Sequence, residues 1–137
     1  MRYRLCPSSQ DMRKGFDVLS GVVRSDMGRD PLTGEVFIFM NRSRTTIKLL
    51  HWERGGLVLY HKRLEKGRFS LPVFYGKSRC YHLLWRDLVL MVEGLSPEKV
   101  RRKKDSKISH KTHKYLLFYL VNCLFFRTFV SWKQYKN

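Results

Sequence analysis

The chain has 137 residues, enough for one domain with a tail, and its 28 Lys and Arg against 11 Asp and Glu give a net charge of +17. Hydrophobic residues make up 43% and aromatic residues 14% of the chain, which excludes wholesale disorder and predicts a packed core. A positive excess of this size favours a polyanionic partner, with nucleic acid the first candidate and an anionic membrane surface the second.

The first elements predicted along the chain are a short strand over residues 2–6 and an amphipathic helix over about residues 11–24. Pro7-Ser8-Ser9 is a turn signal, and either Ser9 or Asp11 suits the helix N-cap. The helix is predicted from apolar residues that recur at helical spacing, namely Met12, Phe16, Leu19, Val22 and Val23. Residues 27–34, which follow this helix, contain Gly, Asp and Pro and are therefore predicted to form a loop.

Three strands are predicted next, over residues 35–40, 45–52 and 57–62. The turns at 41–44 and 53–56 are short, which favours an antiparallel meander. A second amphipathic helix is predicted over about residues 84–95, with Gly94 placed to end it. The expected fold class is therefore α+β: a small antiparallel sheet of three to five strands, packed by two amphipathic helices.

The rear of the chain differs in composition. Residues 1–95 carry 17 basic and 9 acidic side chains and residues 96–137 carry 11 and 2, so the net charge of +17 divides into +8 and +9. We therefore expect one domain over 1–95, followed by a basic linker and an apolar tail over 96–137. The apolar run at 115–126 is shorter than the roughly 18–20 residues that a membrane span needs.

No motif of an enzyme is found in the sequence. It contains no GxxxxGK[ST], GxGxxG after a strand, GxSxG or HExxH, and no spacing of carboxylates marks a metal pair. His110 and His113 are spaced as two ligands on a helix would be, but no second pair of Cys or His completes a zinc site. We expect no catalytic residue, no metal, no cofactor and no small-molecule substrate.

The cysteines and the N-terminus bear on the compartment. Cys6, Cys80 and Cys123 lie far apart without a CxxC pair, which fits a reducing compartment better than a disulfide scaffold. The opening MRYRLCPSSQ has no apolar region typical of a signal peptide. The expected location is cytoplasmic.

Clustered basic side chains are the best candidates for a binding site. Arg13 and Lys14 open the first predicted helix, where the macrodipole adds to their charge. In a meander, the turn at 41–44 and the end of the third strand lie at the same edge of the sheet, so their basic residues are expected to form one patch that binds phosphates. The predicted nucleic-acid-binding residues are Arg13, Lys14, Arg42, Arg44, Lys48, Lys62, Arg63, Lys66 and Arg68.

Two aromatic residues flank the basic stretch YHKRLEKGRFSLP at 60–72. Tyr60 and Phe69 are candidates for base stacking, although aromatic residues of this kind more often belong to a core. A solvated basic surface without a ligand is the alternative to nucleic-acid binding for the whole cluster.

Several blocks of this sequence resemble a known family. DMRKGFDVLSGVV at 11–23, DPLTGEVFIFMNR at 30–42, IKLLHWE at 47–53 and GLVLYHKRLEKGRFSLP at 56–72 look like TnpB, the small accessory protein of IS66-type bacterial insertion sequences. The resemblance covers about residues 3–95 and includes WRDLVLMVEG. It implies a protein that is encoded beside a DDE-type transposase and is needed for the element to move, with no assigned catalytic residues.

The resemblance ends after about residue 104. Family members end soon after a basic run like RRKK at 101–104, so residues 105–137 are either an extension of this lineage or sequence translated beyond a disrupted stop codon. The expected function is an accessory role in DNA transposition, through binding of the element ends, of the transposase, or of both. The alternatives are a protein-only adaptor of the transposase, attachment to a membrane surface through the tail and, more remotely, an independent nuclease.

Overall fold

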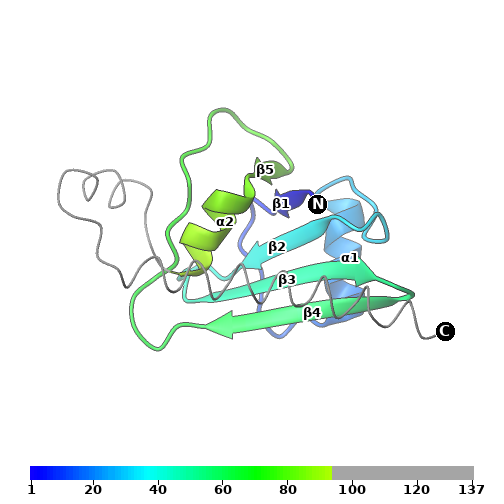
Figure 1. Ribbon diagram of the computed structural model, residues 1–137, viewed down its shortest axis with the longest axis horizontal. Coiled ribbons are helices and arrows are strands. Elements are labelled where there is room, and N and C mark those ends of the chain that lie inside the picture. Colours follow the sequence, from blue (N-terminus) through cyan, green and yellow to red (C-terminus); the bar gives the residue numbers. More distant parts are fainter. Residues whose placement is uncertain (94–137) are drawn as a thin grey trace, which may run out of the picture. The chain divides into compact units, whose positions relative to one another are not determined.

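The computed structural model describes residues 1–93, which form a five-stranded sheet with two helices (Figure 1). In chain order the elements are β1 (Tyr3–Leu5), α1 (Phe16–Ser25), β2 (Val36–Met40), β3 (Thr46–Glu53), β4 (Gly56–Arg63), β5 (Tyr81–Leu83) and α2 (Trp85–Val92). The strands lie in the order β4-β3-β2-β1-β5. The α+β class predicted from the sequence is confirmed.

The predicted meander is formed by β2, β3 and β4. These strands pair antiparallel, with Phe39 opposite Lys48 and Leu50 opposite Leu59. The β3–β4 hairpin closes through Arg54 and Gly55, both with positive φ (43° and 84°). Such a two-residue turn matches the right-handed twist of the paired strands, which is why short hairpins favour glycine here.

The sheet is mixed, and the prediction of a purely antiparallel sheet is wrong on this point. β1 pairs parallel to β2, with Leu5 opposite Ile38, and antiparallel to β5. A parallel pair needs a long crossover connection, which here contains α1. β1 has only three residues, too few for an alternation that would reveal its pairing from sequence.

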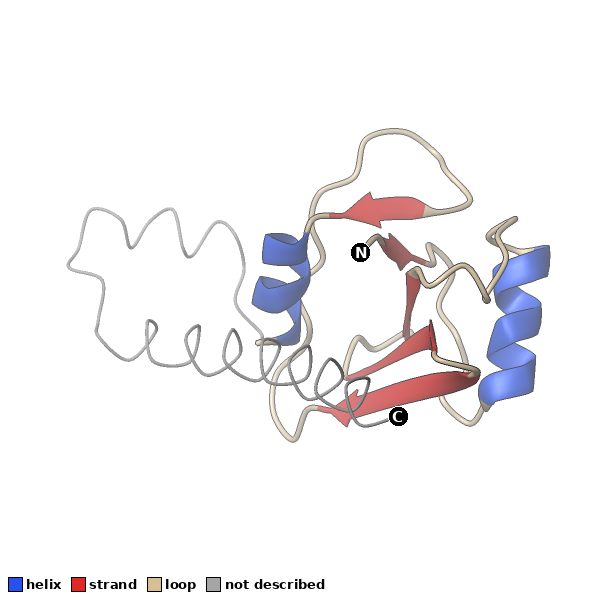
Figure 2. Cartoon of the chain, turned by 45° about the vertical axis from the view of Figure 1, so that its right-hand side comes forward, coloured by secondary structure: helices blue, strands red, loops and turns tan. Residues whose placement is uncertain are grey.

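The two helices cover opposite faces of the sheet (Figure 2). One core packs against α1 and contains Leu19, Val23, Phe37, Phe39 and Leu50. The other packs against α2 and contains Ile38, Ile47, Phe69, Leu88 and Met91. Alternate residues of β2 point to the two cores, so all five residues of this strand are buried.

Helix α1 begins later than predicted. It starts at Phe16 after an extended Gly15, because Asp11 holds a separate turn: its carboxylate accepts from the backbone N–H of Arg13 at 2.9 Å. The buried residues of α1 are Leu19, Ser20, Val22 and Val23, whereas Phe16 is exposed. The predicted apolar stripe is therefore correct over its second half only.

Helix α2 lies within its predicted range of about 84–95, but it ends earlier than predicted, at Val92. It runs from Trp85 to Val92 and buries Leu88, Met91 and Val92. The predictions for Gly94, the basic run at 99–104, His110 and His113, and the apolar run at 115–126 lie outside the described residues.

Candidate nucleic-acid interface

The turn between β2 and β3 is fixed by one side chain. The Asn41 side-chain oxygen accepts from the backbone N–H groups of Thr45 (2.9 Å) and Thr46 (3.0 Å), and its amide nitrogen donates to Ser43 Oγ at 3.0 Å. Arg44 adopts a left-handed conformation with φ of 58°. Asparagine side chains commonly stabilise such turns through bonds to nearby backbone groups. The turn therefore holds its backbone in one shape.

A second loop is attached to this turn. Beyond β4, the backbone N–H of Leu64 donates to Thr45 O at 2.8 Å, and that of Phe69 donates to Arg44 O at 2.7 Å. Gly67, with φ of 78°, supplies the left-handed residue between these two anchors. The buried Phe69 side chain then fixes the end of the loop in the core beside α2. As predicted, the two basic stretches lie at the same end of the sheet.

Four exposed cations lie on these two loops, which we call the free basic surface: Arg42, Arg44, Lys66 and Arg68. Among residues 1–93, none of their side chains takes part in a hydrogen bond or ion pair. The nearby acid Glu65 lies 3.6 Å from the exposed Arg63. The four cations are thus held on fixed backbone with their charges open to solvent.

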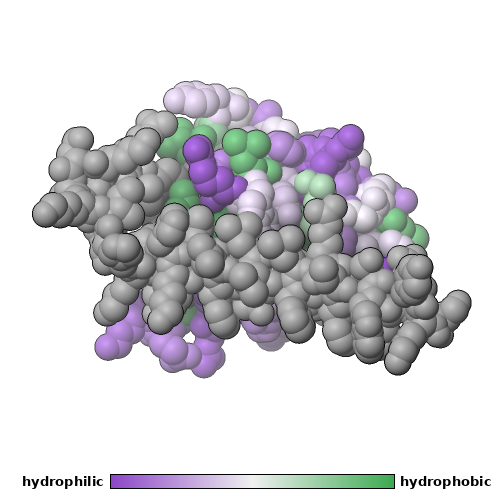
Figure 3. Space-filling model, in the orientation of Figure 1, coloured by the Kyte–Doolittle hydropathy of each residue, from purple (hydrophilic) through white to green (hydrophobic). Residues whose placement is uncertain are grey.

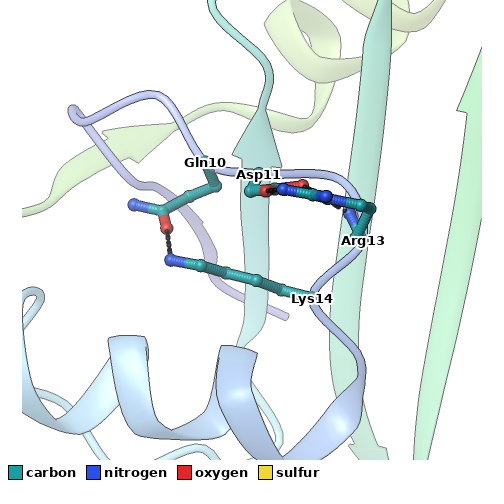
Figure 4. Close-up of polar contacts among 4 residues, drawn as sticks. All are labelled: Gln10, Asp11, Arg13 and Lys14. Atoms are coloured by element: carbon teal, nitrogen blue, oxygen red, sulfur yellow. Dashed lines mark hydrogen bonds and ion pairs between the residues drawn. The ribbon is translucent and has the colours of Figure 1, made fainter.

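Arg13 and Lys14 lie in the turn before α1, not on the helix, so the predicted contribution of the macrodipole is absent. Figure 4 shows Arg13 against Asp11 and Lys14 against Gln10. The Arg13 guanidinium reaches both carboxylate oxygens at 2.6–3.1 Å, and the hydrogen bond from this side chain lowers the pKa of Asp11 to about 2. Lys14 Nζ donates to Gln10 Oε1 at 2.8 Å. The charge of Arg13 is thus partly neutralised by Asp11, and the ammonium of Lys14 is already hydrogen-bonded to Gln10.

Two other predicted residues serve inside the fold. Lys48 is only 6% exposed, and its ammonium donates to the backbone oxygen of Lys14 at 2.8 Å. Lys62 is half-buried and donates to Val92 O at 2.9 Å, at the negative end of α2. Because a buried, hydrogen-bonded Lys48 does not reach a phosphate, we leave it out of the candidate surface.

The two aromatic candidates for base stacking differ in their exposure to solvent. Phe69 is 1% exposed and belongs to the core beside α2, the placement that the sequence favoured for such aromatic residues, so it is no longer a candidate for base stacking. Tyr60 on the edge strand β4 is 45% exposed and stays a candidate.

The prediction missed residues that shape this end of the molecule. The turn at 41–44 was predicted from the sequence, but Asn41 was not singled out as the residue whose side chain organises it. Phe74 and Tyr81 stack with their ring centroids 4.3 Å apart. The local spacing of residues does not predict this ring contact, because it joins an irregular connection to the start of β5.

Residues 1–93 also bear on metal binding and on membrane insertion. No group of three or more His, Cys, Asp or Glu in this part of the chain could hold a metal ion. Neither described helix has the length and apolar content needed to cross a bilayer.

Comparison with known proteins gives a consistent family. The family model described as IS66 Orf2 like protein matches residues 1–102. Two relatives, both from Sinorhizobium fredii, bear the names uncharacterized protein y4jC and uncharacterized protein y4hO. The first is 29% identical over 103 residues, covering 75% of this chain and 86% of the relative. The second is 35% identical over 72 residues, covering 53% and 63%. No solved structure matches the chain.

Proposed function

The chain belongs to the IS66 Orf2-like family, the TnpB accessory proteins of IS66-type insertion sequences, and from this we propose that it serves transposition by binding DNA through the free basic surface. The observation that carries the proposal is the placement of Arg42, Arg44, Lys66 and Arg68 on two joined loops, with no competing partner among residues 1–93. Cations placed this way release counterions from the phosphate backbone, which gives affinity without sequence choice.

The described contacts support unequal contributions of the predicted residues to phosphate binding. The free basic surface supplies the main phosphate contacts, and Arg63 contributes weakly because Glu65 is beside it. Arg13 and Lys14 add little while Asp11 and Gln10 hold them. We assign no catalytic residue, cofactor or small-molecule substrate.

A mobility-shift assay on DNA from the element ends, run across a salt series, tests the proposal. Each lost phosphate contact lowers the slope of log affinity against log salt by about 0.9. We expect Arg42→Gln/Arg44→Gln to reduce the slope by about 1.8 and to weaken binding at every salt concentration. A salt-independent wild-type complex, or no complex at all, contradicts the proposal.

The matched control is Arg24→Gln/Arg29→Gln. It removes the same charge from two exposed arginines on the last turn of α1 and the loop that follows. If this control lowers the slope as much as Arg42→Gln/Arg44→Gln does, net charge rather than the free basic surface carries the binding.

Binding to the DDE-type transposase of the same element is the second candidate function. The irregular connection between β4 and β5 exposes apolar side chains, with Val73 73% and Tyr75 93% accessible. Figure 3 shows hydrophobic residues at the surface beside hydrophilic ones on the coloured part of one face. Co-purification with the transposase that survives nuclease treatment and is lost in Val73→Ser/Tyr75→Ser would establish this role.

We further propose that residues 1–95 form the accessory domain and that the basic run at 99–104 adds non-specific affinity. The family match covers all of residues 1–95 and continues to residue 102, within the basic run. A chain truncated after residue 104 should retain the wild-type salt slope. A truncated chain that no longer binds DNA would place the binding determinants in the tail.

A further inference from the structure

A groove lies directly beside the free basic surface. It has a volume of about 310 Å³ and opens at the carboxyl ends of the parallel strands β1 and β2, next to the turn that carries Arg42 and Arg44. Its apolar wall is formed by Leu5, Met40, Leu71, Phe74 and Tyr81.

The aromatic part of this wall is held in place. The Phe74 and Tyr81 rings stack with an interplanar angle of 21°, and the Tyr81 hydroxyl donates to Gly76 O at 2.9 Å. This bond ties the irregular connection to β5. The groove therefore offers aromatic and aliphatic surface that is held by contacts within the fold.

The charge around the groove is of one sign. Arg42 and Arg44 line it, and its lining contains no acidic residue. Neither guanidinium has a partner among residues 1–93. An apolar hollow with unpaired arginines at its side suits a ligand that joins a flat ring to an anion, as a nucleotide does.

The size of the groove restricts what enters. A volume of about 310 Å³ is at the lower end of small-ligand sites and is sufficient for a single base. A base inside an intact duplex is paired and stacked on its neighbours, and it reaches such a hollow only where the duplex is open.

We propose that this groove binds one unpaired nucleotide of DNA, with its base against the wall of Phe74 and Tyr81 and its phosphate against Arg42 and Arg44. The inference rests on the proposed function, because both use the same two arginines. It goes further in naming single-stranded or frayed DNA, such as exists where element ends are cut, as the preferred substrate.

Binding of two oligonucleotides to the full chain tests the inference. One is a blunt duplex, and the other is the same duplex with a short single-stranded overhang that carries 2-aminopurine at its innermost unpaired position. Stacking of one base on an aromatic side chain corresponds to about 5- to 150-fold in affinity. We expect the overhang to bind more tightly within that range and the 2-aminopurine fluorescence to be quenched on binding.

Phe74→Leu keeps a branched apolar side chain of smaller volume and removes the aromatic ring. We expect it to reduce both the overhang preference and the quenching while leaving blunt-duplex affinity unchanged. Tyr75→Leu is the matched control, because this neighbouring ring is 93% exposed and does not line the groove. Equal denaturation midpoints for wild type and Phe74→Leu exclude unfolding as the cause.

The outcomes separate the two proposals. Equal affinity for both oligonucleotides without quenching overturns the groove inference and leaves duplex binding intact. Absence of any DNA complex overturns both. If Phe74→Leu weakens transposase binding and leaves the overhang preference unchanged, the occupant of the groove is a protein segment, and the nucleotide inference fails.

Discussion

Two basic regions lie near the same end of the sheet and differ in what their charges do. In the turn at residues 11–14, Arg13 is bound to Asp11 and Lys14 to Gln10, and the Lys14 carbonyl accepts from Lys48. On the free basic surface, the backbone is equally well fixed, but among residues 1–93 the cationic side chains have no partner. The first region uses its polar groups to hold the fold, and the second leaves them for a ligand.

The difference shows that the number of Lys and Arg in a segment is a poor measure of its capacity for an anion. A cation is available to an anionic ligand only if no carboxylate, side-chain amide or helix carbonyl lies within hydrogen-bonding distance of it in the folded chain. Lys62 and Arg79 make the same point, because their charges are used at the C-terminal ends of α2 and α1. The predictions below change one side of this comparison at a time.

The largest expected effect comes from Arg4, a cation used entirely inside the fold. Its guanidinium donates from Nε and Nη2 to Glu35 Oε1 at 3.1 Å, and the two side chains are 13% and 9% exposed. Arg4→Ala removes both hydrogen bonds to a buried carboxylate and leaves it only the distant, exposed Arg2, which costs about 3–5 kcal/mol of unfolding free energy. Urea denaturation measures this loss.

Arg2→Ala is the control for Arg4→Ala. Arg2 lies 3.9 Å from the same carboxylate but is 71% exposed, so its removal should cost only about 0–1 kcal/mol. Similar losses for the two variants would show that the Arg4–Glu35 pair is not a buried one.

Replacing Lys48 should affect stability and not DNA binding. Lys48→Met retains the volume but removes the donor to Lys14 O, which should lower the unfolding free energy by about 1–3 kcal/mol. Exposed Lys66→Met should change it by no more than about 0.5 kcal/mol and should reduce the salt slope instead. Denaturation and shift assays on the same preparations check both, and the opposite pattern would reverse the assignment of the two lysines.

Asn41→Ala tests whether the fixed turn matters to the free basic surface. The variant loses the acceptor for two backbone N–H groups, at a cost of about 1 kcal/mol in stability, without changing the net charge. We expect weaker DNA binding with an unchanged salt slope, because Arg42 and Arg44 must then be ordered on binding. Unchanged affinity in Asn41→Ala, with Ser43→Ala as the control, would show that order in the turn is not needed.

The smallest expected effect is a gain of function at Asp11. Asp11→Asn keeps an acceptor for the Arg13 backbone but frees its guanidinium, so the salt slope for DNA should rise by up to about 0.9. Asp17→Asn removes the same charge from α1 and should leave the slope lower than in Asp11→Asn. Equal slopes would show that Asp11 does not restrain Arg13.

The pH dependence of this pair has a definite sign. The pKa of Asp11 is lowered from 3.8 to about 2 by the hydrogen bond from the Arg13 side chain. The Asp11–Arg13 pair is therefore fully formed above pH 3.8 and is lost only as pH falls through about 2. Arg13 should therefore stay bound to Asp11 between pH 5 and 8. An NMR titration of the Asp11 carboxyl, repeated in Arg13→Gln, should show its midpoint rise towards 3.8.

The strands of the meander were predictable because short runs rich in apolar, aromatic and β-branched residues, separated by two turn signals, suffice to place them. The parallel pairing of β1 was not, since three residues carry no period. The same limit holds for the candidate site. The sequence indicated that the turn at 41–44 and the loop after β4 meet. It could not show that the ammonium groups of Lys48 and Lys62 are used inside the fold, because each donates to a backbone carbonyl far away in sequence, 34 and 30 positions respectively.

The position of β2 between two cores has a consequence for how the domain opens. Phe37 and Phe39 belong to one core and Ile38 and Met40 to the other, so loss of either helix exposes a strand that the remaining core also needs. The two layers should therefore melt in a single cooperative transition. In hydrogen–deuterium exchange, the amides of β2 should exchange last and only through global unfolding.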